Sequence, residues 1–258
     1  MTDWKAVVDR ITEFIRKVVS EANADGVVVG LSGGVDSSTT AFLCVKALGK
    51  DKVLGIIMPE RGVTREEDIE DALKVCEILG IDYKFVEINP MVEVFLNELG
   101  EGNRIAVANL KPRIRMIINY YYANNMNRLV AGTGNKSELM TGYYTKYGDG
   151  GVDFLPIGDL YKTEVFELAK FLGVPKRIIE KAPSAGLWVG QTDEGELGIT
   201  YVKLDTILKA LEKGVKPEEI PRRFDVSEEE VRRVLEMVEK SRHKREPPPI
   251  ATVRDLVD

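Results

Sequence analysis

A glycine-rich turn between an apolar run and a helix-like pattern constrains this chain more than any other feature. The apolar residues Val27-Val28-Val29 lead directly into the segment from Gly30 to Ser38, which reads G-L-S-G-G-V-D-S-S, and the apolar spacing beyond it is that of a helix. A strand, a glycine turn and a helix N-terminus in this order bring unpaired backbone N–H groups and the positive end of the helix dipole to one point. The segment therefore predicts a phosphate site.

The residues of this turn differ from those of two better-known phosphate loops. A Walker loop ends in Gly-Lys followed by Ser or Thr, and a dinucleotide-binding turn reads G-x-G-x-x-G; neither string occurs here. Asp36 stands where the Walker loop has its lysine, and a carboxylate beside phosphates is favourable when Mg²⁺ lies between them. The alternative is an ordinary glycine turn in which Asp36 only caps the helix.

The composition of the chain excludes several classes of protein. The 258 residues are 44% hydrophobic, which is enough to bury a sizeable core. No apolar run approaches the roughly 20 residues that span a bilayer, and the first residues open an amphipathic helix rather than a signal peptide. A net charge of −6 is opposite to that of a nucleic-acid binder. We therefore expect a soluble, cytoplasmic protein with neither nucleic acid nor a membrane as its partner.

Cys44 and Cys76 are the only cysteines, and each lies among apolar residues in a helix-like pattern. Neither has a second cysteine or a histidine close in sequence, so the chain carries no zinc motif. We expect both thiols to be buried and unreactive.

Strand-like and helix-like segments alternate through the first half of the chain, which is the pattern of βαβ units. The expected fold class is α/β: a Rossmann-like three-layer fold with a central parallel sheet of about five strands, helices on both faces and a helical C-terminal region. Strands are expected near residues 26–31, 53–58, 83–88, 128–132 and 153–157, and helices near residues 3–22, 36–49, 65–79, 90–99, 109–125 and 163–172.

The second half of the chain changes character, because helices near residues 200–213, 217–224 and 227–241 follow one another without strands. We interpret residues 1–258 as a single domain with a helical appendage at about 199–245, and the glycine-rich segment 184–198 as a lid. Three local signals support helix starts. Thr64 and Ser227 each open the form of a capping box, and Pro90 suits a first helical position.

Three loops are expected to face a ligand, because open parallel sheets bind ligands beyond the carboxyl ends of their strands. These loops span residues 32–38, 58–63 and 133–138. The third contains a second glycine-rich turn, in which Glu138 supplies a carboxylate suited to hold Mg²⁺ opposite Asp36. The alternative for Glu138 is a first-turn acid that stabilises its own helix.

Cations stand near two expected helix starts. Lys162 begins the helix at 163–172, and Lys111, Arg113 and Arg115 lie in the first turn of the helix expected from residue 109. A cation is unfavourable at the positive end of a helix dipole unless an anion is near. We therefore expect an anionic partner at both places, and a phosphate would suit Lys162.

The string Ser32-Gly33-Gly34-x-Asp36-Ser37 resembles the signature of the ATP pyrophosphatases, enzymes that cleave ATP between its α and β phosphates. From about Gly30 to Arg245 the chain is similar to the NAD synthetases within that superfamily. The resemblance implies ATP as co-substrate, Mg²⁺ as the metal and deamido-NAD as the substrate. The metal ligands that it implies are Asp36 and Glu138, and the catalytic residues are Asp36, Glu138 and Lys162. The implied ATP contacts are Gly30, Leu31, Ser32, Gly33, Gly34, Val35, Asp36, Ser37, Met58, Thr133, Lys162 and Ser184, and the implied deamido-NAD contacts are Arg113, Lys146, Asp153, His243 and Lys244.

The reaction implied by the resemblance is the amidation of deamido-NAD with ammonia, through an acyl-adenylate, to give NAD, AMP and pyrophosphate. The chain leaves no room for a separate glutaminase domain, so free ammonia is the expected donor. The resemblance also implies a homodimer with the substrate pocket at the subunit boundary. The sequence supports a dimer only through one apolar helix face, which a buried core helix would explain equally well; this face comprises Ile114, Ile117, Ile118 and Tyr121.

Two other interpretations stay open at the level of sequence. The chain could be another ATP pyrophosphatase, such as a GMP-synthetase-like or a tRNA-modifying enzyme, although the latter would need a more basic surface. It could also be a nucleotide sensor without turnover. The pairing of Asp36 with Glu138 favours an enzyme over a sensor.

Overall fold

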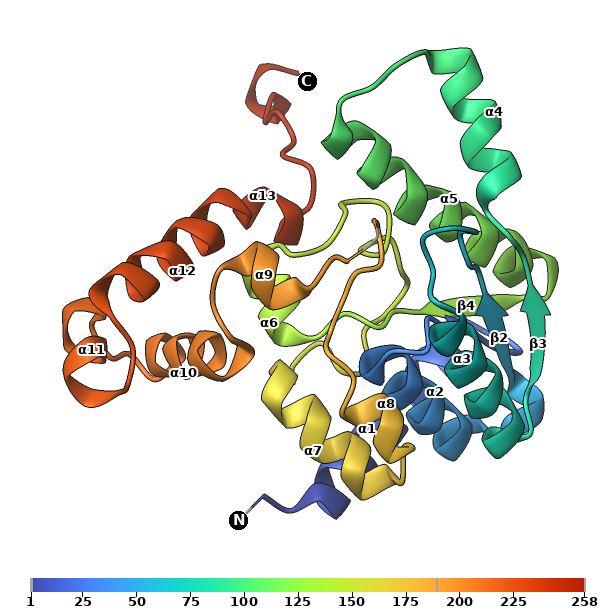
Figure 1. Cartoon of the computed structure of the whole chain (residues 1–258), viewed down its shortest axis with the longest axis horizontal. Helices are drawn as coiled ribbons and strands as arrows, with labels where there is room; N and C mark the ends of the chain where they lie inside the picture. Colours follow the sequence, from blue (N-terminus) through green and yellow to red (C-terminus); the bar gives the residue numbers. More distant parts are fainter. Residues whose placement is uncertain (1, 189, 258) are drawn as a thin grey trace.

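The computed structural model describes residues 2–188 and 190–257 and is an α/β protein (Figure 1). Four parallel strands form one sheet in the order β3-β2-β1-β4. The strands are β1 (Gly26–Gly30), β2 (Val53–Ile57), β3 (Asp82–Phe85) and β4 (Arg128–Ala131). The first four expected strands are confirmed, and β1 and β2 are buried because their apolar side chains point alternately to the two faces of the sheet.

Alternation along β1 divides the core into two layers. Val27 and Val29 pack with the helices on one face, whereas Val28 packs with the helices on the other. The first face carries α1 (Trp4–Glu21), α2 (Val35–Leu48), α3 (Glu66–Leu79), α7 (Lys162–Leu172) and α8 (Lys176–Ile179). The second carries α4 (Asn89–Leu99) and α5 (Arg104–Asn125). The three-layer arrangement expected from the sequence is therefore confirmed.

The expected fifth strand at 153–157 was wrong in extent. This segment forms only one parallel bridge, between Ala131 and Phe154, flanked by the bonds Asp153 N–H to Val130 O and Gly132 N–H to Phe154 O. The ladder stops there because Pro156 has no N–H to donate, and the chain then turns at Gly158.

The start of α5 was also predicted wrongly. The helix begins at Arg104 rather than near residue 109, with the Asn103 side chain accepting the Ala106 N–H at 2.9 Å, and it continues through Pro112. Because Pro112 lies in the interior of α5, the cations beside it are not in the first turn, and the dipole argument does not apply to them.

Two of the three predicted helix starts are confirmed. Ser227 forms a capping box with Glu230 at the start of α12, and Pro90 lies in the first turn of α4. The capping box predicted at Thr64 was wrong, since α3 begins at Glu66 and the Thr64 hydroxyl instead accepts the Glu60 N–H at 2.9 Å.

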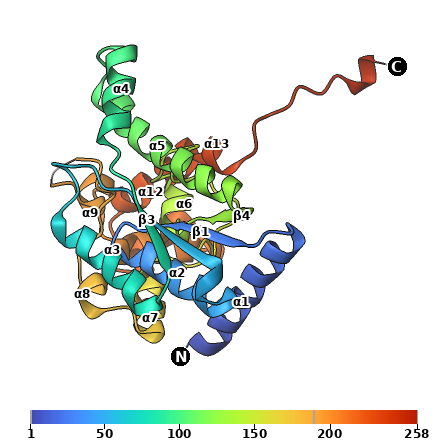
Figure 2. The ribbon, with the colours of Figure 1, turned by 90° about the vertical axis from the view of Figure 1, so that its right-hand side faces the viewer.

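The C-terminal part of the chain is helical, as expected, and lies to one side of the sheet (Figure 1). A separate apolar core holds it together and includes Leu204, Ile207, Ile220 and Val234. Beyond it the tail extends away from the rest of the chain (Figure 2). None of the helices within the described ranges is long and apolar enough to cross a membrane. The remaining elements are η1 (Lys50–Lys52), α6 (Lys136–Thr141), α9 (Asp193–Leu197), α10 (Tyr201–Glu212), η2 (Pro217–Glu219), α11 (Ile220–Arg223), α12 (Glu228–Lys240), α13 (Arg242–Arg245) and η3 (Arg254–Leu256).

Gly33 is the residue that lets the glycine loop pack directly on α3. Its φ is +76°, and a Cβ added to it would lie 2.1 Å from the backbone oxygen of Asp68. Only glycine satisfies both the left-handed backbone and this close approach.

Gly33→Ala should lower the free energy of unfolding by more than Gly62→Ala does. Gly62 also has a positive φ, of +83°, but its Cβ would meet nothing within 4 Å. We expect Gly62→Ala to cost about 1 kcal/mol from backbone strain alone, and Gly33→Ala to cost about 1–3 kcal/mol more from overpacking. Urea denaturation measures both values, and equal losses would contradict the packing argument.

Candidate active site

The carboxyl ends of β1 and β4 meet at the point where the strand order reverses, which is where open parallel sheets bind their ligands. The glycine loop follows β1 and leads into α2, and the second glycine turn follows β4 and leads into α6. The N-terminus of α7 comes to the same place, because its first residue bonds to both loops' helices. Three chain segments therefore build one polar site.

The glycine loop is held in shape by its own serines. The Ser37 hydroxyl accepts the Ser32 N–H at 3.3 Å and lies 3.1 Å from the Ser32 hydroxyl, while the Ser38 hydroxyl donates to the Gly34 carbonyl at 2.8 Å. Gly34, the N-cap of α2, has no side chain to cap the helix. The loop therefore presents the helix N-terminus without a competing side-chain cap.

Not every residue of the predicted ATP loop has a side chain that faces the site. Leu31 and Val35 are buried in the hydrophobic core, and the Leu31 N–H bonds to the Ile56 carbonyl at 2.8 Å. These two residues serve the loop by anchoring it. Gly30, at the end of β1, continues the sheet into the loop.

Three predicted catalytic side chains meet at the centre of the site. The Lys162 ammonium forms an ion pair with Asp36 Oδ2 and lies 3.5 Å from Glu138 Oε1. The Lys162 side chain is only 2% exposed, and the two carboxylates are 17% exposed each. The anionic partner that the sequence predicts for Lys162 is therefore present within the protein itself.

Asn135 belongs to this cluster, and the sequence analysis missed it. Its amide donates to Asp36 Oδ1 at 3.0 Å, and its Oδ1 accepts the Glu138 N–H at 3.1 Å. Asn135 and Glu138 also form a capping box at the start of α6. The spacing of Asn135 and Glu138 is a local signal for that box, but nothing local predicts the bond to Asp36.

The charges of the cluster shift one another's protonation. Burial, together with the nearby Asp36 charge, raises the pKa of Glu138 from 4.5 to about 8, although the Lys162 ammonium opposes this rise. Burial works against the charge of Lys162, but Asp36 and Glu138 outweigh it and raise the pKa of Lys162 above its usual range. The site therefore holds a charged ammonium and one carboxyl that changes protonation near neutral pH.

The lid segment packs on α5 through two cations. The Lys111 ammonium pairs with Glu60 at 2.8 Å and donates to the Leu187 carbonyl at 2.8 Å, and the Arg104 guanidinium lies 4.2 Å from the centre of the Trp188 ring. Glu60 is thus the anion beside Lys111. An anion was expected there because Lys111 was predicted to lie in the first turn of its helix, and that placement was wrong.

The lid also brings a carboxylate toward the cluster. Asp193 begins α9, and its Oδ2 accepts the Tyr201 hydroxyl at 3.1 Å, while its buried Oδ1 has no hydrogen-bond partner among the described residues. Burial raises the pKa of Asp193, and the nearby Lys162 charge opposes part of this rise. Asp193 and Lys162 therefore interact electrostatically. The predicted lid residue Ser184 is exposed, and its hydroxyl accepts the Gly186 N–H at 3.1 Å.

Four of the five predicted deamido-NAD residues come together beside α6. Arg113 donates to the Lys146 carbonyl at 3.3 Å, the Lys146 ammonium donates to the His243 carbonyl at 2.6 Å, and Lys244 donates to the carbonyls of Gly142 and Tyr144 at 2.6 Å.

The fifth residue, Asp153, is held internally. It accepts the Tyr120 hydroxyl at 3.0 Å and the Val130 N–H at 2.7 Å, so it bonds to α5 and to β4.

Two further predicted ATP residues lie at the rims of the site. The Met58 carbonyl accepts the Arg115 side chain at 3.0 Å, which leaves it with one lone pair for another donor. Thr133 lines a cavity of about 40 Å³, which Glu138, Tyr144 and Asp149 also line. Glu138 and the second glycine turn therefore share the lining of one small cavity.

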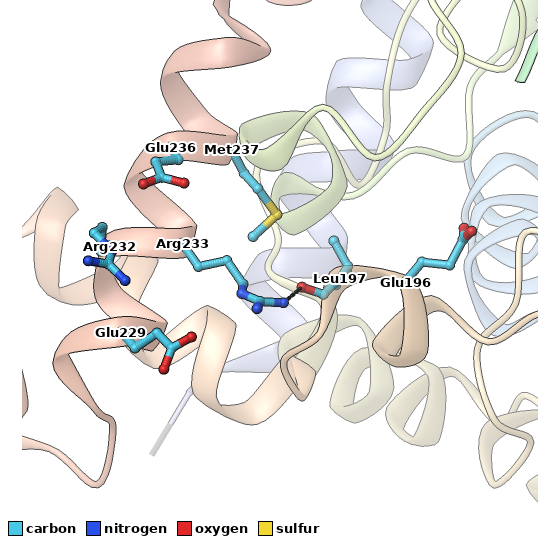
Figure 3. A pocket seen from close by; sticks show the side chains of 7 residues that line it. All are labelled: Glu196, Leu197, Glu229, Arg232, Arg233, Glu236 and Met237. Carbon is cyan, nitrogen blue, oxygen red and sulfur yellow. Dashed lines mark hydrogen bonds between the residues drawn. The ribbon is translucent and has the colours of Figure 1, made fainter.

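A larger cavity, of about 480 Å³, lies between α9 and α12 and contains none of the predicted site residues (Figure 3). Arg233 crosses it and donates to the Leu197 carbonyl at 3.4 Å. Glutamate and arginine side chains give its lining both signs of charge. The lining residues are Glu196, Leu197, Glu229, Arg232, Arg233, Glu236 and Met237.

Within the described residues, no group of three or more His, Cys, Asp or Glu side chains is arranged to hold a metal ion. Asp36 and Glu138 supply hard oxygen ligands that fit Mg²⁺, but the other ligands would have to come from phosphates or water. Cys44 and Cys76 are buried, as expected, and burial raises the pKa of Cys44 to about 12 and that of Cys76 to about 11. Neither thiol is suited to act as a nucleophile.

Comparison with known proteins gives a consistent result. The chain matches the NAD synthase family over residues 7–248. An NH(3)-dependent NAD(+) synthetase of Archaeoglobus fulgidus is 66% identical over 255 residues, which cover 99% of this chain and 100% of that protein. An NH(3)-dependent NAD(+) synthetase of Methanocaldococcus jannaschii is 57% identical over 247 residues, which cover 94% of this chain and 95% of that protein.

Two solved structures resemble this one closely. An NMN synthetase from Francisella tularensis has a TM-score of 0.87 at 36% identity, and the match covers 97% of this chain and 99% of that one. An NH3-dependent NAD synthetase from Campylobacter jejuni has a TM-score of 0.84 at 34% identity, and the match covers 98% of this chain and 100% of that one.

Glu138→Gln should change how stability depends on pH. A carboxyl whose pKa rises from 4.5 to about 8 on folding holds its proton in the folded state, so folding loses stability as pH rises from about 4.5 to about 8. The free energy of unfolding of the wild type should therefore fall relative to that of Glu138→Gln across this window, by at most about 1.4 kcal/mol per pH unit. Urea denaturation at pH 5, 6, 7 and 8 measures the difference.

Asp159→Asn is the control for this measurement, because the Asp159 side chain is 96% exposed and pairs only with Lys136. Its stability curve should run parallel to that of the wild type. A parallel curve for Glu138→Gln as well would contradict the raised pKa.

Proposed function

This chain belongs to the NAD synthase family and is an enzyme of NAD synthesis, and we propose that the site described above forms the amide of NAD from deamido-NAD and ammonia, with ATP as the activating co-substrate. The observation that carries the proposal is the meeting of Asp36, Glu138 and Lys162 at the mouth of the glycine loop. This arrangement joins an anion-binding helix terminus to two carboxylates and one buried cation.

Activation by ATP is necessary because ammonia cannot displace oxide from a carboxylate. In the proposed reaction a carboxylate oxygen of deamido-NAD attacks the α-phosphorus, and the bond from that phosphorus to the bridging oxygen breaks, releasing pyrophosphate. Ammonia then attacks the acyl carbon of the adenylate, AMP leaves, and the nitrogen loses a proton. Positioning and charge stabilisation are sufficient for both steps, and no protein nucleophile is needed.

Each residue of the cluster has a role that follows from its place. Asp36 and Glu138 would hold Mg²⁺, which would supply positive charge to stabilise the leaving pyrophosphate. Lys162 would place its ammonium against the same phosphates. Asn135 holds the Asp36 carboxylate from one side at 3.0 Å and so fixes its direction.

Ammonia would occupy the small cavity beside Glu138. Its volume of about 40 Å³ is enough for one molecule of the size of water or ammonia.

Deamido-NAD would lie against the polar side chains gathered beside α6. Arg113, Lys146 and His243 are joined there by direct hydrogen bonds, and Lys244 follows His243 in the chain. The side chains of Arg113, Lys146 and Lys244 donate to carbonyl groups, which an anionic substrate can replace. In this proposal the whole function is carried by one synthetase domain. The proposal also includes a cytoplasmic location, because ATP, ammonia and deamido-NAD must all reach the site.

A homodimer with the substrate site at its boundary is also part of the proposal. The helix face predicted for the interface divides in the structure: Ile114 and Ile118 are core residues, whereas Ile117 is 54% and Tyr121 67% exposed. The two exposed side chains support a contact surface on α5, and the buried pair serves the core as the alternative interpretation expected.

A second candidate substrate is the acid of the mononucleotide, since one close structural relative is named an NMN synthetase. The same chemistry would apply to it, because activation and amide formation involve the same carboxyl group. We favour deamido-NAD because the relatives that are 66% and 57% identical to this chain are named NH(3)-dependent NAD(+) synthetases.

The product assay tests the function directly. With ATP, Mg²⁺, ammonia and deamido-NAD, the wild type should release AMP and pyrophosphate in equal amounts and form NAD. Asp36→Asn and Glu138→Gln should each lower turnover by about 10²–10³-fold, the usual cost of losing one charge-stabilising group. Asp159→Asn should keep the wild-type rate, because that side chain is almost fully exposed.

Substrate replacement separates the alternatives. Glutamine in place of ammonia should give no product, and a higher kcat/KM with the mononucleotide acid would favour the second candidate. Turnover at the wild-type rate in either purified site variant would reject the metal role of that residue, and no AMP release with any acceptor would reject the function.

Tyr121→Glu should separate the proposed dimer. We expect sedimentation velocity to show a monomer and the KM for deamido-NAD to rise at least about tenfold, which corresponds to roughly 1.4 kcal/mol of lost binding. Val202→Glu is the matched control, because Val202 on α10 is also 67% exposed. A wild type that is monomeric and fully active would contradict the shared pocket.

A further inference from the structure

A buried carboxylate in the C-terminal helical region joins the two helices that carry Glu138 and Lys162. Asp205 lies on α10 and is 2% exposed. Its Oδ1 accepts a hydrogen bond from the Ser137 hydroxyl of α6, and its Oδ2 accepts the Thr163 N–H of α7 at 2.8 Å. The Ser137 oxygen in turn accepts the Lys162 N–H at 2.9 Å. Three helices therefore meet at one carboxylate.

Each of these hydrogen bonds acts on the backbone beside a catalytic side chain. Ser137 directly precedes Glu138, and the Lys162 N–H is itself one of the bonded groups. A shift of α6 against α7 would change the distance from Glu138 Oε1 to Lys162 Nζ, which is 3.5 Å. Because Ser137 is completely buried, water cannot easily replace a lost bond.

The same carboxylate compensates for the placement of Lys162. Lys162 is the first residue of α7, where the positive end of the helix dipole opposes a cation. The first turn of α7 contains one acid, Glu164, which bonds back to the Tyr161 N–H at 2.9 Å. Asp205 adds a second negative charge at the N–H groups of this turn, from a different helix.

We propose that Asp205 is a positioning residue for the reaction, which acts through Ser137 and the backbone of Lys162 and Thr163 to hold the Glu138 carboxylate and the Lys162 ammonium in register. The choice of assay substrates rests on the function proposed above. The effect on Lys162 can also be measured with Mg²⁺ and ATP alone, without deamido-NAD or ammonia.

Glu212 provides a matched control on the same helix. Its carboxylate accepts the Tyr161 hydroxyl at 2.9 Å and pairs with the Lys136 ammonium, so it also ties α10 to α6 and α7. It bonds neither to Ser137 nor to the backbone of the first turn of α7. Glu212→Gln therefore loosens α10 without removing the bonds that position the catalytic side chains.

The test compares Asp205→Ala, Asp205→Asn and Glu212→Gln with the wild type. Asp205→Ala should lower kcat about 10–100-fold, the range expected when a catalytic group is misplaced by about 1 Å, and should weaken Mg–ATP binding in calorimetry. The kcat of Asp205→Asn should lie between those of Asp205→Ala and the wild type, because the amide oxygen of the asparagine still accepts a hydrogen bond from one of the two donors. The KM for deamido-NAD should change less than about twofold in all three, and Glu212→Gln should keep its kcat within about twofold.

A double-mutant cycle with Lys162→Ala separates positioning from folding. If Asp205 acts through Lys162, Asp205→Ala should slow the Lys162→Ala enzyme far less than it slows the wild type. If the double variant loses kcat by the full product of the two single losses, the proposal is overturned. A wild-type kcat in folded Asp205→Ala would also overturn it.

If Asp205→Ala does not fold, Ser137→Ala takes its place in the cycle, since it removes the bridge to Lys162 and leaves α10 intact. If the wild type turns over no substrate, the proposed function is rejected. Unchanged Mg–ATP affinity in the Asp205 variants would separately reject the positioning role of Asp205.

Discussion

A buried ammonium between two carboxylates is the interaction on which the rest of the site depends. Lys162, Asp36 and Glu138 come from three separate segments, and all three side chains are largely withdrawn from water. Moving such ions out of water costs several kcal/mol each, and removing one partner leaves the others uncompensated. The fold must therefore bring the ends of β1 and β4 and the start of α7 together before the charges can balance.

In the proposed function, the balance of charge would require nucleotide and metal to bind together. A divalent cation alone would face the Lys162 ammonium, and a triphosphate alone would face Asp36 and Glu138. With both bound, the ammonium would face phosphate and the carboxylates would face the metal. The ion cluster would therefore favour nucleotide and metal together over either one alone.

Short-range patterns predicted most of the fold and part of the site. The glycine loop, the four strands and the Ser227 capping box each depend on residues within a few positions of one another. Two predictions failed near prolines: Pro156 ends the pairing expected at residues 153–157, and Pro112 lies inside α5, which begins at Arg104 rather than near residue 109. Asn135 and Asp205 could not be found in this way, since their bonds to Asp36 and Ser137 span 99 and 68 residues.

Two contacts join the segment 184–198 to α5, and their strength sets part of the free energy needed to move that segment. Lys111 holds the Leu187 carbonyl through one hydrogen bond, and Arg104 lies against the Trp188 ring. A hydrogen bond from a charged donor contributes about 1.5–3 kcal/mol, and an exposed cation–π contact about 0.5–1 kcal/mol. Opening these two contacts therefore costs roughly 2–4 kcal/mol, less than the 8 kcal/mol of a micromolar ligand. Lys111 stays paired with Glu60 when the Leu187 bond breaks, so the loss of that contact leaves the Lys111 charge compensated.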